Sequence, residues 1–184
     1  MGENKKRQWT LKVALLGDPA VGKTSLIKNY ITHSFSENYQ PTLGVNIVTK
    51  DIKLEEFNID IRLILWDIAG QDKYDLTRKM FFQGCTGALL VYDITRYATF
   101  NQITTKWLED FNKFGRPDGI YILIGNKLDL KDSIKVTTSE GMALAQKIEA
   151  KEFLETSAKY GENVEDAFKK LVLHILRKNG VNFE

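Results

Sequence analysis

The clearest chemistry in the sequence lies in the loop Gly17–Thr24, GDPAVGKT, which matches the phosphate-binding pattern G-x-x-x-x-G-K-[ST]. Gly17 and Gly22 allow a close approach of the backbone that a side chain would block. The N–H groups of such a loop, followed by a helix N-terminus, present partial positive charge to phosphate oxygens. Lys23 can then supply a charge for the β- and γ-phosphates, while the Thr24 hydroxyl can bind Mg²⁺. The loop therefore predicts a nucleoside triphosphate site.

A second motif, N-K-x-D, begins at Asn126 and ends at Asp129, and it predicts which base is bound. The Asp129 carboxylate can accept hydrogen bonds from N1–H and the 2-amino group of guanine, whereas adenine lacks both donors. Asn126 would reach the N7 edge of the base and tie neighbouring loops together, and the Lys127 stem would lie along the base plane. In the segment Ser157–Lys159, the Ala158 backbone N–H could meet guanine O6. Together they favour guanine.

Four further residues predict hydrolysis of a bound GTP. Asp67 ends an apolar run and suits a contact to Mg²⁺ through water, and Thr42 could complete the shell of that ion. The Gly70 N–H can point to the γ-phosphate, while Gln71 can orient the attacking water. The only candidate cofactor is therefore Mg²⁺, with GTP as substrate and GDP as product.

Short apolar runs alternate with helix-period segments over the whole chain, and this order predicts the elements that would position these loops. The expected buried strands are Leu11–Leu16, Ile61–Trp66, Ala88–Tyr92, Ile120–Ile124 and Phe153–Thr156. The expected helices are Lys23–His33, Phe100–Phe114, Ser139–Ala150 and Val164–Lys178.

One further segment, Val45–Leu54, meets Ile61–Trp66 across the short connection Glu55–Asn58, which predicts an antiparallel edge strand. Elsewhere the strand–helix order implies right-handed crossovers and a parallel sheet. We therefore expect a three-layer α/β domain of the P-loop NTPase type, with a six-stranded, mostly parallel sheet and about five helices. Its ligand should bind outside the carboxyl ends of the strands.

Composition limits the remaining possibilities. The 184 residues are 43% hydrophobic and 27% charged, with a net charge of +2, which suits one globular domain over residues 1–184 with a core of about 9–178. So balanced a charge gives no reason to expect a nucleic acid partner.

The sequence also gives no sign of a membrane span. Cys85, the one cysteine, is expected in the core, and no apolar run approaches the roughly 20 residues of a membrane span. The last residues offer no cysteine to prenylate, so we expect a cytoplasmic chain without a membrane anchor, peripheral to membranes only if a lipidated tail is missing from it.

In order and spacing, these motifs resemble the Ras superfamily of small GTPases, and the Rab-like branch most of all. The resemblance covers residues from about Trp9 to Lys178 and implies that Phe35 stacks on guanine. It also implies two switch segments, Tyr39–Gly44 and Ala69–Met80, through which effector, exchange-factor and GTPase-activating proteins would bind. The implied nucleotide-binding set is Asp18, Ala20, Val21, Gly22, Lys23, Thr24, Ser25, Phe35, Tyr39, Thr42, Gly70, Asn126, Lys127, Asp129, Ser157, Ala158 and Lys159. Gln71, Lys23 and Thr42 are the expected catalytic residues, and Thr24, Thr42 and Asp67 the expected Mg²⁺ residues.

Pro19 departs from the family pattern, because a side chain there would crowd the γ-phosphate and Gln71. The sequence between His33 and Thr42 also holds no arginine, so unaided hydrolysis should be slow, with roughly 10³–10⁵-fold available from a partner's arginine. Two other functions stay open at this point. The first is a GTP-binding interaction module that scarcely hydrolyses, and the second is an ATPase or kinase with the same fold, which Asp129 argues against.

Overall fold

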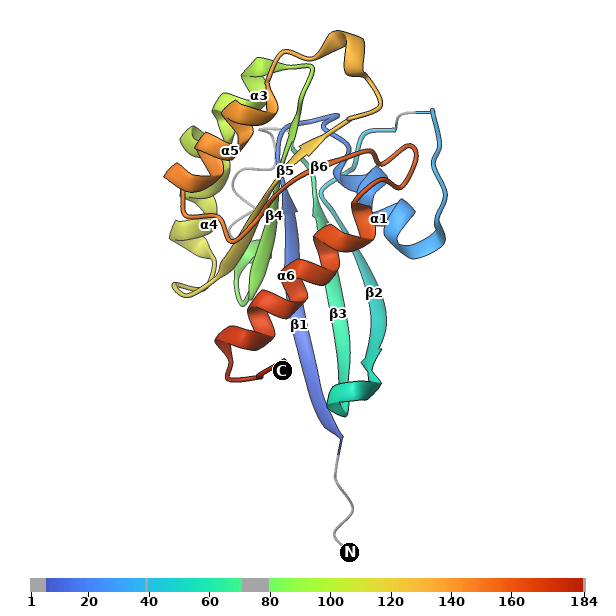
Figure 1. The fold of residues 1–184 in the computed structure, drawn as a ribbon, viewed down its shortest axis with the longest axis vertical. Helices are drawn as coiled ribbons and strands as arrows, with labels where there is room; N and C mark the ends of the chain where they lie inside the picture. The colour runs from blue at the N-terminus through green and yellow to red at the C-terminus, as the bar shows by residue number, and fades with distance from the viewer. Residues whose placement is uncertain (1–5, 39, 71–79, 184) are drawn as a thin grey trace, which may run out of the picture.

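A computed structural model describes residues 6–38, 40–70 and 80–183 of the chain. A six-stranded sheet runs through the described residues in the order β2-β3-β1-β4-β5-β6 (Figure 1). The strands are β1 Arg7–Leu16, β2 Val45–Leu54, β3 Ile59–Ile68, β4 Gly87–Asp93, β5 Ile120–Asn126 and β6 Phe153–Thr156. β2 pairs antiparallel with β3, and every other pairing is parallel. The predicted sheet and its antiparallel edge strand are confirmed.

Helices cover both faces of this sheet, as the alternating sequence pattern predicts (Figure 1). They are α1 Lys23–Thr32, α3 Tyr97–Gln102, α4 Leu108–Phe114, α5 Thr138–Lys147 and α6 Val164–Lys178, and a π-helical turn, Ile103–Trp107, joins α3 to α4. Side chains on β1 alternate between the two faces. Val13 joins the core that α1 and α6 cover, whereas Ala14 joins the core beneath α3, α4 and α5. The result is the expected three-layer α/β arrangement.

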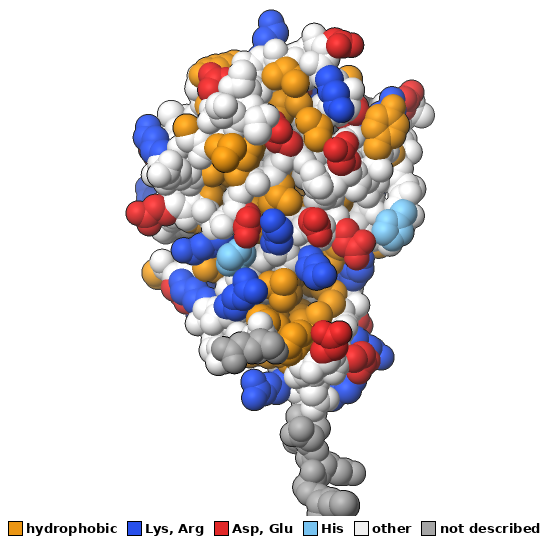
Figure 2. Space-filling view, in the orientation of Figure 1, with side chains coloured by type: hydrophobic (Ala, Val, Ile, Leu, Met, Phe, Trp, Pro, Cys, Tyr) orange, Lys and Arg blue, Asp and Glu red, His pale blue; other side chains and the backbone are white. Residues whose placement is uncertain are grey.

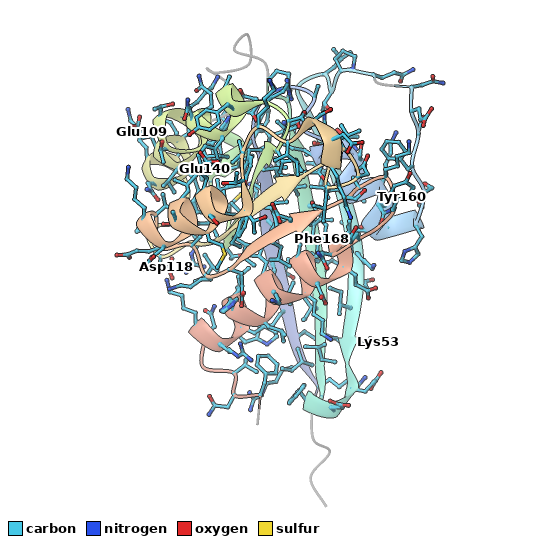
Figure 3. All side chains as sticks on the ribbon, turned by 45° about the horizontal axis from the view of Figure 1, so that its top comes forward. Lys53, Glu109, Asp118, Glu140, Tyr160 and Phe168 are labelled. Carbon is cyan, nitrogen blue, oxygen red and sulfur yellow. The ribbon has the colours of Figure 1, made fainter. Side chains whose placement is uncertain are left out.

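The core forms where apolar strands meet apolar helix stripes. All seven residues of β4 are buried, and α6 buries the 3–4 spaced stripe predicted for it. Phe168, labelled on α6 in Figure 3, stacks on Tyr30 of α1 with the ring centroids 4.1 Å apart. Cys85 is fully buried, as expected. This packing holds the carboxyl ends of the strands, and the loops that follow them, at one edge of the sheet.

Several elements extend beyond their predicted bounds, and two of them start three or more residues earlier than predicted. β1 begins at Arg7 instead of Leu11, because backbone pairing with β3 continues through four residues whose side chains gave no apolar pattern. The helix predicted to start at Phe100 begins at Tyr97. Its earlier start follows from the buried Thr99, whose hydroxyl donates to the Arg96 carbonyl at 2.8 Å and accepts the Asp93 N–H at 3.0 Å.

The surface over α6 and α5 mixes Lys and Arg with Asp and Glu side chains, interspersed with apolar ones (Figure 2). The face that Figure 2 shows carries no large cluster of like charges, in keeping with the net charge of +2. Among the described residues, no helix combines the length and the apolar character that crossing a membrane requires.

Candidate functional site

The phosphate-binding loop connects β1 to α1, and two glycines allow its path. A Cβ on Gly17 would lie 2.1 Å from the Val91 carbonyl oxygen, so the loop passes too close to β4 for any side chain. Gly22 caps α1 with φ +103°, and a Cβ there would lie 2.2 Å from Nδ2 of Asn126. Glycine is required at both positions, as the sequence motif predicts.

Lys23 lies inside this loop and is 6% exposed. Its ammonium donates to the carbonyls of Gly17 and Asp18 at 2.6 Å and 2.9 Å. The charge is therefore fixed at the centre of the loop, where the loop N–H groups and the start of α1 add partial positive charge. An anion at this point would meet a preformed cationic cradle.

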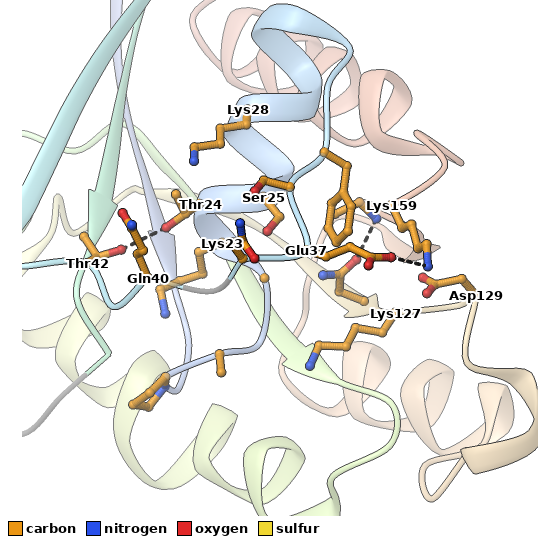
Figure 4. A pocket seen from close by; sticks show the side chains of 18 of the residues that line it. Lys23, Thr24, Ser25, Lys28, Glu37, Gln40, Thr42, Lys127, Asp129 and Lys159 are labelled. Atoms are coloured by element: carbon orange, nitrogen blue, oxygen red, sulfur yellow. Dashed lines mark hydrogen bonds and ion pairs between the residues drawn. The ribbon is translucent and has the colours of Figure 1, made fainter.

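Beside Lys23 lie three side chains with oxygen atoms of the kind that Mg²⁺ prefers: Asp67 and two threonines, Thr24 and Thr42, which Figure 4 labels. The Thr24 hydroxyl donates to Oδ2 of Asp67 at 2.5 Å and lies 2.9 Å from the Thr42 hydroxyl, which is 3.5 Å from the same carboxylate oxygen. Asp67 is 1% exposed, and its Oδ1 has no hydrogen-bond partner among the described residues. Burial raises the pKa of Asp67 despite hydrogen bonds from both threonines. An unsatisfied buried carboxylate oxygen fits a divalent cation.

Across the cavity, Asn126 ties three segments together. It is 1% exposed, and its amide nitrogen donates to the Val21 carbonyl at 2.8 Å. Its oxygen accepts from the Thr156 hydroxyl at 3.0 Å and from the Ala158 N–H at 3.2 Å. The Asp129 carboxylate is oriented by a hydrogen bond of 2.7 Å from the Ser157 hydroxyl. This side of the site is therefore built from buried, mutually satisfied polar groups.

Lys127, by contrast, is held by a carboxylate that the sequence analysis missed. Its ammonium lies 2.6 Å from Oδ2 of Asp93, whose side chain is 1% exposed and lies at the end of β4. Hydrogen bonds from Lys127 and Thr95 lower the pKa of Asp93, although burial acts in the opposite direction. Asp93 could have been found from the sequence, because it ends an apolar strand in the same way as Asp67.

One cavity of about 580 Å³ lies among these groups, a size typical of small-molecule sites. Figure 4 shows Thr24 and Thr42 at one end, with Lys127, Asp129 and Lys159 at the other. Of the predicted residues, the cavity is lined by Ala20, Gly22, Lys23, Thr24, Ser25, Phe35, Thr42, Gly70, Asn126, Lys127, Asp129, Ala158 and Lys159. Asp18, Val21, Ser157 and Asp67 do not line it, and Tyr39 and Gln71 lie outside the described residues.

Several lining residues were not in the predicted nucleotide-binding set: Pro19, Lys28, Ser36, Glu37, Asn38, Gln40 and Leu130. Lys28 could have been found, because it follows Thr24 by four positions on the helix and therefore shares its face. Glu37 makes an ion pair of 3.1 Å with Lys159. That pair joins segments far apart in sequence, so no local pattern marks it.

The fold and the cavity together define a phosphate-loop nucleotide-binding protein of the α/β class. The family model described as the Ras family matches residues 12–177. The chain is 36% identical to Ras-related protein RIC2 of Oryza sativa subsp. japonica and 37% identical to Ras-related protein YPT3 of Nicotiana plumbaginifolia, covering 92% of this chain and 76% of each relative. It is 38% identical to Ras-related protein Rab11E of Lotus japonicus with the same coverage.

The chain therefore belongs to the Ras family and is a Rab-like small GTPase. It binds GTP, hydrolyses it, and acts as a molecular switch. The resemblance predicted from the sequence motifs is confirmed.

Proposed function

We propose that the cavity binds GTP and GDP with the phosphates against Lys23 and the guanine between Asn126, Asp129 and Ala158. One observation carries the proposal: a buried ammonium within a phosphate loop and an oriented carboxylate line the same cavity. Phe35, 38% exposed and also on the cavity wall, provides a ring for stacking on the base. We also propose that residues 1–184 form a single domain.

The polar groups of the base side give the proposed guanine selectivity. Ser157 orients the Asp129 carboxylate to accept from N1–H and the 2-amino group, and adenine would leave that carboxylate unpaired. Asn126 holds the N–H of Ala158 beside the base site, and the Lys127 stem, anchored at Asp93, lies along it.

Thr24 and Thr42 would hold Mg²⁺, with Asp67 contacting it through water. When bound, this ion neutralises charge on the β- and γ-phosphates. Thr42 and Gly70 belong to the two switch segments, so both would contact the γ-phosphate end of GTP and lose that contact after hydrolysis. We assign the orientation of the attacking water to Gln71.

Pro19 supports a second candidate, a GTP-binding module with impaired hydrolysis. Gly70 packs so closely on the loop that a Cβ there would lie 2.5 Å from the Asp18 carbonyl carbon and from the Pro19 nitrogen. The proline ring therefore stands directly beside the residue that precedes Gln71, where it restricts the space for an attacking water.

Partner binding is assigned to the surface beside the switch segments. Leu43, Ile47 and Met80 are 75%, 48% and 72% exposed, which is unusual for large apolar side chains. We propose that effectors, exchange factors and GTPase-activating proteins bind this surface. We also propose that the protein works in the cytoplasm, in trafficking or signalling, and is peripheral to membranes only if a lipidated tail is missing from this chain.

The test measures binding and hydrolysis separately on purified protein. GDP and GTP should displace a fluorescent GDP analogue, while ATP at a thousandfold excess should not. Single-turnover hydrolysis of bound GTP should be slow and should fall further in Gln71→Leu, with GDP affinity unchanged. Gln83→Leu, which changes an exposed glutamine beyond the second switch, is the matched control. Displacement by ATP would overturn the base assignment, and a wild type that binds GTP without hydrolysing it would favour the second candidate.

A further inference from the structure

The outer side of the phosphate loop is held by contacts that do not reach the nucleotide. The guanidinium of Arg96 donates through Nη2 to the Pro19 carbonyl at 2.9 Å. The Trp107 indole N–H donates to the Asp18 carboxylate at 2.7 Å. Both donors come from the segment after β4, and neither residue lines the cavity.

Arg96 is itself fixed by a buried carboxylate. Its Nε donates to Oδ2 of Asp93 at 2.9 Å, the same oxygen that lies 2.6 Å from the Lys127 ammonium. The other oxygen of Asp93 accepts from the N–H and the hydroxyl of Thr95 at 2.9 Å and 2.6 Å. Arg96, Lys127 and Thr95 thus all donate to this 1% exposed carboxylate and limit its movement. These contacts therefore hold the Arg96 guanidinium in the orientation in which it reaches the Pro19 carbonyl.

The position of Trp107 is set by a local distortion of the helix that follows Arg96. It closes the π-helical turn Ile103–Trp107, which interrupts the helix between α3 and α4. A π-helical turn shifts the following side chains around the helix axis and is frequent at functional sites. Here it coincides with the fully buried indole that contacts Asp18.

These contacts surround the two residues Asp18 and Pro19. Arg96 holds the Pro19 carbonyl and Trp107 holds the Asp18 side chain from outside, while Gly70 packs against the two residues on the switch side. Proline offers no N–H, so the backbone of residue 19 can be held only through its carbonyl. A shift of these two residues would change the space between the loop and Gly70.

We propose that Arg96 is a positioning residue for GTP hydrolysis: held by Asp93, it fixes the phosphate loop at the Pro19 carbonyl and so sets the spacing between the loop and Gly70. The proposal rests on the proposed function of the cavity. It also links the two ends of the site, because the carboxylate that holds Arg96 is the one that holds Lys127.

A positive charge alone cannot make these contacts, because Arg96 uses two nitrogen donors at once: Nε donates to Asp93 and Nη2 donates to Pro19. Arg96→Lys keeps the positive charge beside Asp93, but a single ammonium on a shorter stem cannot reproduce both the Nε and the Nη2 contacts. Arg96→Lys and Arg96→Ala should therefore both slow single-turnover hydrolysis of bound GTP, by about two- to tenfold, the effect of one hydrogen bond. Arg116→Ala is the matched control, because Arg116 pairs locally with Asp118 at 3.0 Å on the exposed surface.

The experiment compares wild type, Arg96→Lys, Arg96→Ala and Arg116→Ala in single-turnover hydrolysis, release of a fluorescent GDP analogue, and urea unfolding. The expected result is slower hydrolysis in both Arg96 variants. The unfolding midpoint of Arg96→Lys, which keeps a cation beside the buried Asp93 carboxylate, should equal that of Arg116→Ala, whereas Arg96→Ala should also lose stability. Wild-type hydrolysis in Arg96→Lys would overturn the proposal in favour of a charge effect, and slowing in Arg96→Lys matched by an equal loss of stability would overturn it in favour of a structural one. Failure of the wild type to bind the GDP analogue would instead refute the proposed function.

Discussion

The two ends of the cavity are built in different ways. At the base end, Asn126 is 1% exposed and bonds to Val21 in the phosphate loop and to Thr156 and Ala158 at the end of β6, so it joins three segments including its own. At the phosphate end, the Thr42 hydroxyl bonds to Thr24 and Asp67, and the described residues 34–38 and 40–44 form no helix or strand.

This difference separates the groups that would recognise the guanine nucleotide from the groups that would sense whether the γ-phosphate is present. Groups that the fold holds in place bind GTP and GDP equally, so they add affinity without changing the balance between two states. In the proposed function, Thr42 and Gly70 would meet the γ-phosphate, and a contact present in one nucleotide state only is what shifts an equilibrium. We therefore expect base-end variants to affect both nucleotides and phosphate-end variants to affect only events at the γ-phosphate.

The largest effect should come from Asp129→Asn, which breaks recognition at the base end. An amide cannot accept from both guanine donors, so GDP and GTP affinity should each fall by about 10⁴-fold. Its N–H can donate to the C2 carbonyl of xanthine, so xanthosine diphosphate should now compete. Displacement of a fluorescent GDP analogue measures both effects. Asp132→Asn, an exposed carboxylate on the next turn, should change nothing, and GDP binding retained within tenfold would contradict the assignment of Asp129.

Asn126→Ala should have the next largest effect, because it leaves the Val21 carbonyl and the Ala158 N–H without their partner. We expect GDP and GTP affinity to fall together by about 100-fold and the free energy of unfolding to fall by about 2–4 kcal/mol. Calorimetric titration and urea unfolding measure these two quantities, with the exposed Asn101→Ala as control. If GTP binding fell while GDP binding did not, the two ends would not differ as described.

Thr42→Ala tests the phosphate end. Removing its hydroxyl should slow single-turnover hydrolysis by about tenfold, the loss of one interaction in the transition state, and leave GDP affinity within about twofold. Thr42→Ser, which keeps the hydroxyl, should recover most of the rate. A large loss of GDP affinity in Thr42→Ala, measured by displacement of the fluorescent analogue, would show that this end also contributes to recognition.

The smallest effect should come from the ion pair between Glu37 and Lys159, which joins the segment before the first switch to the base end. Both side chains are exposed, so Glu37→Gln should speed release of the GDP analogue by less than about threefold. The difference should vanish at high salt because salt screens exposed charges. Glu56→Gln, another exposed glutamate, is the control. A larger, salt-independent change would mean that this pair closes the cavity.

Much of the fold could be predicted because its signals are local. The bounds of β2, β6 and α6 match their predicted ranges, since each has a sharp change of hydrophobic pattern at its ends. The π-helical turn before Leu108 could not be predicted, because it keeps a helical pattern while changing where Trp107 points. The start of β1 depends on pairing with β3, which is a contact between distant segments.

The sequence by itself determined the phosphate loop, the N-K-x-D motif and the order of strands and helices, because residue type and short spacing set each of them. Only the tertiary structure decided that Asp93 holds Lys127 and Arg96 on one oxygen, and that Arg96 reaches Pro19. Pro19 and Arg96 lie 77 positions apart, so no local pattern links them. Their contact exists because β1 and β4 pair side by side and bring the loops that follow them together.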